Sequence, residues 1–237
     1  MASAVACFTF DNMDPTDPDA PARGYPAIYA LLERHAVRAT FFLEGWNGAH
    51  RPDAVREVVR RGHELGMHGW RHEPWQTLAP ATEVALAARA TDALGGAAGV
   101  APRGFRAPGG GRTADTETVL ARLGYRYDAS LGDGMTPRRL ASGLAQVPFV
   151  WSGVDGFHYL RSEPASPGDV RDGWLAVLAR VAERGGLFVT VCHAFLTGVD
   201  ADRLAALDAV VGAARADARV AIRTAGEVAG ALVAGEG

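Results

Sequence analysis

The chain has no lysine: all 24 of its basic residues are arginine. This absence excludes Schiff-base chemistry and a pyridoxal-phosphate anchor, which both need a lysine amine, and it excludes a Walker-type phosphate loop. The chain also lacks any long block of like charges, and its formal net charge is −3. Nucleic acids and anionic membranes attract strongly basic surfaces. We therefore expect neither as a partner.

Cysteine and long apolar runs are equally scarce. Cys7 and Cys192 stand in different apolar runs and form no Cys-x-x-Cys pair, so we interpret both as buried free thiols. No run of about 18 apolar residues occurs, and a membrane-spanning helix requires one. Met1 leads into the first apolar run without the charged and apolar regions of a signal peptide, which predicts a cytoplasmic protein.

The residues that are present indicate an α/β fold. The chain has 237 residues, 48% of them hydrophobic and 22% charged, as in ordinary globular proteins. Short apolar runs rich in Val, Phe and Thr alternate with segments of helical period, a pattern typical of a mainly parallel sheet or barrel. No low-complexity linker divides the chain. We predict a single domain over residues 1–237, a distorted (β/α) barrel of seven to eight strands.

The expected strands are Val5–Phe10, Thr40–Leu43, Glu64–His68, Gly104–Arg106, Arg126–Asp128, Val147–Val150, Leu187–Cys192 and Val220–Ile222. The expected helices are Ala27–His35, Asp53–Arg61, Thr82–Leu94, Thr116–Leu123, Val170–Arg184, Asp202–Ala214 and Ala225–Val233.

Capping residues support several helix boundaries. Thr224-Ala-Gly-Glu227 matches a capping box, and Pro52 and Pro80 precede periodic runs, where a first-turn proline is tolerated. The pairs Gly95-Gly96 and Gly185-Gly186 stand where helices are expected to stop.

Polar residues follow the first and third expected strands. Asp11, Asn12 and Asp14 come after the first, and His68 and His72 come after the third. In a barrel the carboxyl ends of the strands build the active site. Two histidines four residues apart can reach one metal ion through a single turn. The aspartates could equally cap a turn, so these residues alone leave both interpretations open.

The fourth and seventh strands have similar endings. Arg106 precedes a Pro-Gly-Gly-Gly turn that contains Gly109, and His193 ends the apolar run Leu187–Cys192. A glycine-rich turn can bring backbone N–H groups close to a substrate oxygen, and histidine is the usual general acid at neutral pH. A surface ion pair, a flexible turn and a core histidine are the structural alternatives.

Five segments in order carry a family resemblance. They are Thr9–Asn12, Gly62–His72, Phe105–Gly110, Tyr127–Ser130 and Val191–His193. Together the segments resemble the polysaccharide deacetylase family (NodB-like, carbohydrate esterase family 4) over about residues 8 to 193. The resemblance implies a distorted, incomplete (β/α) barrel.

The resemblance also implies roles for individual residues. Asp11 matches the general base for the attacking water, and His68 and His72 match the metal-binding pair. His193 matches the general acid that protonates the leaving amine. A metal lowers the pKa of water toward neutrality, so a carboxylate can complete its deprotonation.

Three further positions match the family's supporting residues. Arg106 matches the arginine that orients the base, and Gly109 stands where a backbone N–H stabilises the oxyanion. Asp128 matches an aspartate expected to pair with His193 and raise its pKa.

The sequence departs from the family pattern at Asn12, where a second aspartate usually serves as the third metal ligand. Either Asn12 still coordinates through its amide oxygen, or Asp14 takes over, or the site binds metal weakly. We take Zn²⁺ as the default metal, with Co, Ni or Fe as alternatives, because such ligands discriminate little among them.

The expected substrate is a small molecule. Family members that act on polymers are exported, whereas no signal peptide is expected here. The segment 147–159 brings aromatic rings near a strand end, and we expect Trp151, Asp155, Phe157 and Tyr159 to bind substrate. Core packing is the alternative for these rings.

We predict a metal-dependent amide hydrolase that removes an N-acyl group, typically N-acetyl, from a small sugar-like or specialised metabolite. The stretch after His193 also resembles the superfamily branch that opens allantoin and cyclic imides, so an allantoinase-like amidohydrolase is one alternative. A non-catalytic small-ligand binding protein that has lost tight metal binding is another. The sequence does not determine the oligomeric state.

Overall fold

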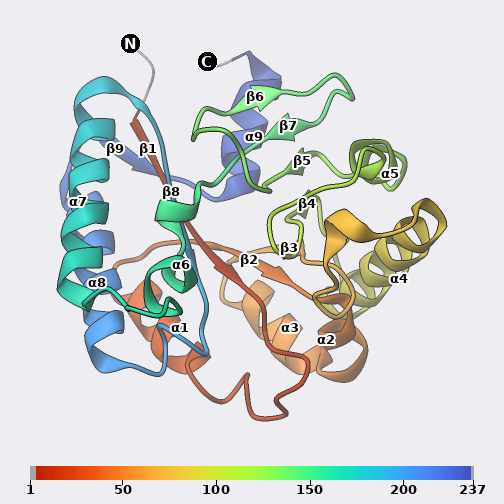
Figure 1. The fold of residues 1–237 in the computed structure, drawn as a ribbon, viewed down its shortest axis with the longest axis horizontal. Helices are drawn as coiled ribbons and strands as arrows, with labels where there is room; N and C mark the ends of the chain where they lie inside the picture. Colours follow the sequence, from red (N-terminus) through yellow and green to blue (C-terminus); the bar gives the residue numbers. More distant parts are fainter. Residues whose placement is uncertain (1–3, 236–237) are drawn as a thin grey trace.

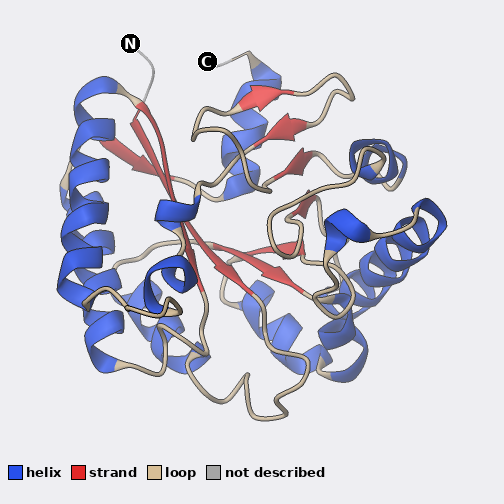
Figure 2. Ribbon diagram, viewed as in Figure 1, coloured by secondary structure: helices blue, strands red, loops and turns tan. Residues whose placement is uncertain are grey.

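The computed structural model describes residues 4–235, which form one curled sheet flanked by helices (Figures 1 and 2). The strand order is β6-β7-β5-β4-β3-β2-β1-β8, and β9 also pairs with β1. The strands are β1 (Ala4–Asp11), β2 (Thr40–Leu43), β3 (Glu64–Met67), β4 (Gly104–Phe105), β5 (Tyr127–Asp128), β6 (Arg138–Arg139), β7 (Ala145–Gln146), β8 (Gly186–Cys192) and β9 (Val220–Ile222).

Helices cover the sheet on its outer sides. In Figure 1, α7 and α8 lie along one side of the strands and α4 and α5 along the other, with α9 behind β6 and β7. The helices are α1 (Tyr25–Arg34), α2 (Gly45–His50), α3 (Pro52–Arg60), α4 (Pro80–Ala98), α5 (Thr116–Arg122), α6 (Asp155–Tyr159), α7 (Pro167–Arg184), α8 (Ala201–Ala216) and α9 (Ala225–Ala234), with 3₁₀ turns at Trp75–Thr77 and Trp151–Gly153. No helix among residues 4–235 has the length and apolar character needed to cross a membrane.

The predicted distorted, incomplete barrel is confirmed. Among the described strands every pair is parallel except β6 with β7, which are antiparallel at one end of the sheet. The hairpin interrupts the strand–helix repeat, which resumes with α7 and β8. Within the described residues β6 and β8 end the strand order without pairing to each other, so the sheet curls without closing.

Two predicted boundaries are wrong. The strand expected at Val147–Val150 is instead β7, which begins two residues earlier. Phe149 makes only an isolated bridge to Leu131. Pro148 interrupts that segment and has no N–H to donate to a ladder. The pair Gly95-Gly96 lies inside α4, which ends before Gly99 in the left-handed conformation (φ 72°).

Other boundary signals are confirmed. Thr224 and Glu227 form the capping box of α9, and Pro52 and Pro80 begin α3 and α4. Gly185, with φ 77°, ends α7. The short helices α2 and α6 were not predicted, because five or six residues carry too little helical period.

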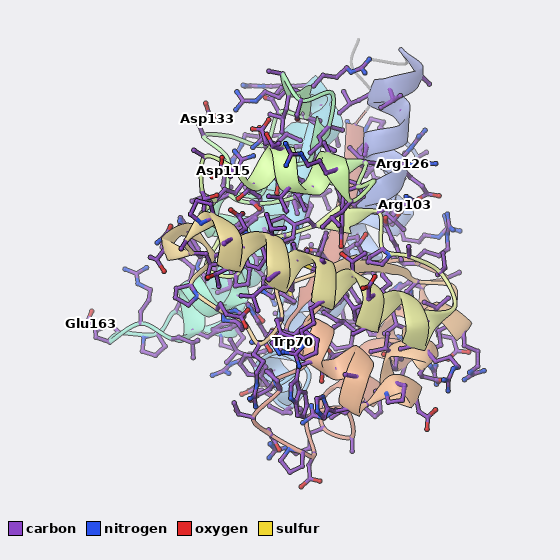
Figure 3. All side chains as sticks on the ribbon, turned by 90° about the vertical axis from the view of Figure 1, so that its right-hand side faces the viewer. Trp70, Arg103, Asp115, Arg126, Asp133 and Glu163 are labelled. Atoms are coloured by element: carbon purple, nitrogen blue, oxygen red, sulfur yellow. The ribbon has the colours of Figure 1, made fainter. Side chains whose placement is uncertain are left out.

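Close helix packing supports the turn after β3. A side chain at Gly45 of α2 would lie 2.3 Å from the Ala90 backbone of α4 and 2.9 Å from the Trp70 ring. Trp70 lies against α4 (Figure 3), and the Arg89 guanidinium lies 3.7 Å from its ring centroid. This packing fixes the segment between His68 and His72.

Candidate functional site

The carboxyl ends of the neighbouring strands β3, β2, β1 and β8 bring the predicted site residues to one edge of the sheet. At the end of β1, Asp11 is buried and its Oδ1 accepts a hydrogen bond from Arg106 Nη1 at 2.7 Å. Arg106 also donates to Thr9 Oγ1 and to the Ala129 carbonyl oxygen. The predicted pairing of Arg106 with Asp11 is therefore present, and it fixes the orientation of the carboxylate.

His68 and His72 lie on either side of the turn that follows β3, with ring centroids 5.0 Å apart. His68 is buried, and its Nδ1 donates to the Arg106 carbonyl oxygen at 2.8 Å, since a carbonyl can only accept. The lone pair of His68 Nε2 is therefore free. Burial lowers the pKa of His68 to about 3 and also lowers the pKa of the more exposed His72.

Backbone strain gathers at this edge. Four non-glycine residues have positive φ among residues 4–235, and three of them, Asn12 (63°), Asp14 (44°) and His72 (67°), are predicted site residues. Such conformations cost free energy and cluster at functional sites. Asn12 Oδ1 accepts a hydrogen bond from the Asp14 N–H at 2.6 Å, and Asp14 Oδ1 accepts from Thr16. Both side chains therefore stabilise their own turn.

His193 follows β8 and pairs with Asp155. Its Nδ1 lies 2.6 Å from Asp155 Oδ1, and its backbone N–H donates to Asp155 Oδ2. Thr197 Oγ1 also donates to Asp155 Oδ2 at 2.6 Å. Burial disfavours the charged imidazole, but the Asp155 carboxylate outweighs it and raises the pKa of His193. Its Nε2 makes no hydrogen bond with residues 4–235.

Two predictions about aspartates are therefore wrong. Asp128 does not pair with His193: its Oδ2 accepts from Arg112 Nη1 at 2.7 Å and its Oδ1 accepts from Ser130. Burial raises the pKa of Asp128 despite Arg112. Asp155 is fully buried and occupied by His193 and Thr197, so it is not available to bind substrate.

The glycine-rich turn lies on the same edge, after β4. Gly109 is exposed and has φ 71°. No hydrogen bond within the described part of the chain uses its backbone N–H. A side chain at Gly110 would lie 3.1 Å from the Phe149 ring and 3.7 Å from the Trp151 ring. Trp151 therefore lies beside the turn that contains Gly109.

The aromatic residues of segment 147–159 divide into two groups. Trp151 and Phe157 are each 42% exposed, so both can contact a ligand. Tyr159 is buried beneath Arg203, whose guanidinium lies 4.6 Å from the ring. The prediction that Tyr159 binds substrate is wrong, because its ring is part of the core.

The sequence analysis missed Glu44, which directly follows β2. Glu44 is fully buried, and its Oε2 accepts hydrogen bonds from the Met13 N–H and from Asn47 Nδ2. Its Oε1 has no hydrogen-bond partner among residues 4–235. Burial raises the pKa of Glu44 to about 7. The available signal was its position at a strand end.

His68 and His72 have the chemistry expected of metal-binding histidines. A ligating imidazole is neutral and donates its other ring N–H to a second group, as His68 does to the Arg106 carbonyl. No three His, Cys, Asp or Glu side chains among residues 4–235 stand together as a ligand set. The two histidines would therefore supply two ligands, and both their role and the identity of a third stay predictions.

Comparisons with known proteins agree with this geometry. A candidate polysaccharide deacetylase of Mycobacterium smegmatis superposes with a TM-score of 0.90 at 29% identity, covering 100% of this chain and 92% of that one. Puue allantoinase gives a TM-score of 0.82 at 18% identity over 96% and 89% of the two chains. At that identity the likeness is one of fold alone.

Sequence similarity covers a smaller part. A chitin deacetylase of Colletotrichum lindemuthianum is 32% identical over 112 residues, 45% of this chain and 45% of that protein. The chain thus spans less than half the length of this relative. The model of the polysaccharide deacetylase family matches residues 2–127, more than half of the 237 residues. The chain belongs to the polysaccharide deacetylase family.

Proposed function

We propose that the chain is a metal-dependent hydrolase that removes an N-acyl group, in the simplest case N-acetyl, from a small sugar-like or specialised metabolite. One observation carries the proposal: the Asp11–Arg106 pair, the His68–His72 pair and the His193–Asp155 pair meet at one edge of the sheet. An oriented carboxylate and a histidine with a raised pKa suit a general base and a general acid.

Each residue has a defined task in amide hydrolysis. Asp11 accepts a proton from the attacking water as the new C–O bond forms. The Gly109 N–H stabilises the negative charge on the carbonyl oxygen. His193 then donates its Nε2 proton to the leaving nitrogen as the C–N bond breaks, giving a carboxylic acid and an amine. A divalent metal held by His68 and His72 would lower the pKa of water and polarise the acyl group.

The first test is metal content. Purified wild-type protein is expected to contain about one divalent metal ion per chain by plasma mass spectrometry, in the ratio that one ligand set implies. The His68→Ala, His72→Ala double variant is expected to contain none. A wild-type chain that holds no metal and hydrolyses no amide would favour a non-catalytic binding protein.

The second test is product analysis. Metal-loaded protein is incubated with N-acetylglucosamine, with a chitin oligomer and with a panel of cyclic imides and ureides. We expect acetate release, greatest with the smallest substrate. Ring opening without acetate would favour an allantoinase-like reaction, which the same base and acid could perform on a cyclic amide.

A further inference from the structure

One carboxylate at this edge has no task in the mechanism above. Glu44 directly follows β2 and keeps an extended backbone, with φ −72° and ψ 141°. Leu43 is paired with Met67 in the register of β2 and β3, and its carbonyl accepts the His68 N–H at 2.8 Å. Glu44 and His68 are therefore the first residues after the paired ends of these two adjacent strands.

Glu44 also shares the face of the sheet that carries the base. Side chains two residues apart on a strand point to the same face. Phe42 is two residues before Glu44, is paired with Asp11 in the register of β1 and β2, and has its ring 4.3 Å from the Arg106 guanidinium. Glu44 is therefore in the same layer as Asp11 and Arg106.

The contacts of Glu44 lead to the strained turn after β1. Its Oε2 accepts from the Met13 N–H at 3.1 Å and from Asn47 Nδ2 at 2.8 Å. Arg51 donates to Asn47 Oδ1 and to the Met13 carbonyl, but no ion pair of the described residues joins any arginine to Glu44. The carboxylate therefore holds the turn that carries Asn12 without a cation of its own.

The unpartnered Oε1 is the decisive feature. A buried carboxylate oxygen that accepts no hydrogen bond is costly, so its retention calls for a partner outside the chain. Asn12 meanwhile offers only a neutral amide at the position where a second carboxylate would stand. The unpaired oxygen and the missing charge lie on adjoining strand ends.

We propose that Glu44 is the second carboxylate of the site: it positions the Asn12–Met13 turn and supplies to a divalent cation held by His68 and His72 the negative charge that Asn12 lacks. This inference rests on the proposed metal-dependent function. It makes Glu44 a positioning residue, whose removal changes metal affinity even when no substrate is present.

The test is Zn²⁺ titration of the metal-free protein by calorimetry, without any activity measurement. Glu44→Gln keeps the shape of the side chain and an acceptor for the Met13 N–H, and we expect it to bind Zn²⁺ about 10- to 100-fold more weakly than the wild type. The matched control is Glu64→Gln, which changes a glutamate on the next strand and is expected to leave Zn²⁺ affinity unchanged. The Tm of metal-free Glu44→Gln is measured alongside, because the buried Gln amide places an N–H donor without a partner where the unpaired oxygen stood, and any loss of stability must be separated from the loss of affinity.

Asn12→Asp provides a rescue. Added to Glu44→Gln, it is expected to restore most of the lost Zn²⁺ affinity. In the wild-type background it should raise Zn²⁺ affinity by less than about tenfold, which is the lower end of the effect of a residue that supports metal ligands. If Glu44→Gln does not fold, the comparison of Asn12→Asp with the wild type still tests the inference. A much larger gain in Zn²⁺ affinity from Asn12→Asp alone would show that Glu44 supplies no charge.

Two results would overturn the inference. Equal Zn²⁺ affinity in wild type and Glu44→Gln, with or without a lower Tm, would leave Glu44 a purely structural residue while the proposed function stood. A wild-type protein that binds no Zn²⁺, Co²⁺ or Ni²⁺ would overturn the proposed function as well.

Discussion

The neighbouring strands β2 and β3 carry glutamates at opposite ends: Glu44 follows the carboxyl end of β2, and Glu64 stands at the amino end of β3. The two carboxylates differ in how fully they are hydrogen-bonded. Glu64, at the start of β3, accepts hydrogen bonds from Thr40 Oγ1, Tyr127 OH and the Gly226 N–H. Glu44, at the end of β2, leaves one buried oxygen unpaired. A fully paired carboxylate stabilises the fold, whereas a buried unpaired one calls for a partner from outside the chain, a water, an ion or a ligand.

The amino and carboxyl ends of the strands also differ in the residues that surround the two glutamates. At the amino ends of the strands, a groove of about 900 Å³ is lined by arginines that include Arg38, Arg103 and Arg126, and no predicted site residue is among its described lining. Figure 3 shows Arg103 and Arg126 on the opposite side of the molecule from Asp133 and Glu163. The size of a groove is therefore a poor guide to the chemistry of this fold.

The largest expected effect follows from changing the base at the carboxyl end. Asp11→Asn removes the proton acceptor but leaves an oxygen for Arg106, so we expect kcat to fall by about 10²- to 10⁴-fold with little change in circular dichroism. Glu64→Gln is the control from the amino end, and its Tm should fall while kcat is retained. Comparable kcat losses in both variants would remove the functional distinction between the two ends.

The next effect distinguishes the two aspartates assigned to His193. The pKa of His193 is raised, so the protonated acid persists above its usual range and activity is lost as pH rises through the raised pKa. Asp155→Asn should move the alkaline limb of the kcat/KM profile to lower pH by about one to three units, the usual effect of one nearby opposite charge.

Asp128→Asn is the matched control for that profile. Because Asp128 contacts Arg112 and Ser130 instead of His193, its loss should lower the Tm and leave the alkaline limb in place. An alkaline limb that moves with Asp128 and not with Asp155 would contradict the pairing in the structure.

The pH dependence of folding stability runs in the same direction as that of activity. A raised pKa in the folded state adds stability at pH below the unfolded value, and this contribution is lost as pH rises through the folded pKa. The difference in Tm between wild type and Asp155→Asn should therefore shrink from pH 5 to pH 9, measured by differential scanning fluorimetry. A constant difference would mean that Asp155 acts through its hydrogen bonds alone.

A smaller effect concerns the aromatic rim. Trp151→Ala should raise KM several-fold with little change in kcat, because the exposed ring lies beside the Gly109 turn and away from the reacting groups. Tyr159→Phe should leave KM unchanged, because that ring is buried. A change in KM with Tyr159 alone would favour a different substrate path.

The smallest effect is expected at the amino end. Arg38 pairs with Glu227, and both side chains are largely exposed. Arg38→Ala should cost at most about 1 kcal/mol of unfolding free energy, as exposed ion pairs do, and it should not change kcat. Denaturant unfolding and a single kinetic assay suffice to measure both. A large loss of kcat would mean that the amino-end groove takes part in function.

The sequence by itself determined the type of fold and which residues form most of the candidate site. Parallel strands of a curled sheet end at one edge, so Asp11, His68, Arg106, Gly109 and His193 could be assembled from their positions after apolar runs. Local signals placed the starts of α3, α4 and α9: a first-turn proline begins α3 and α4, and a capping box begins α9, and each involves residues only a few positions apart.

Only the tertiary structure decided which polar groups pair. Asp155 reaches His193 across 38 positions of sequence, and Asp128 is held by Arg112, and nothing in the spacing of these residues distinguishes them. The open oxygen of Glu44, the burial of Tyr159 and the sheet that curls without closing depend on register and packing between distant segments. Local sequence carries no information on those contacts, because their energies arise only when the strands are assembled.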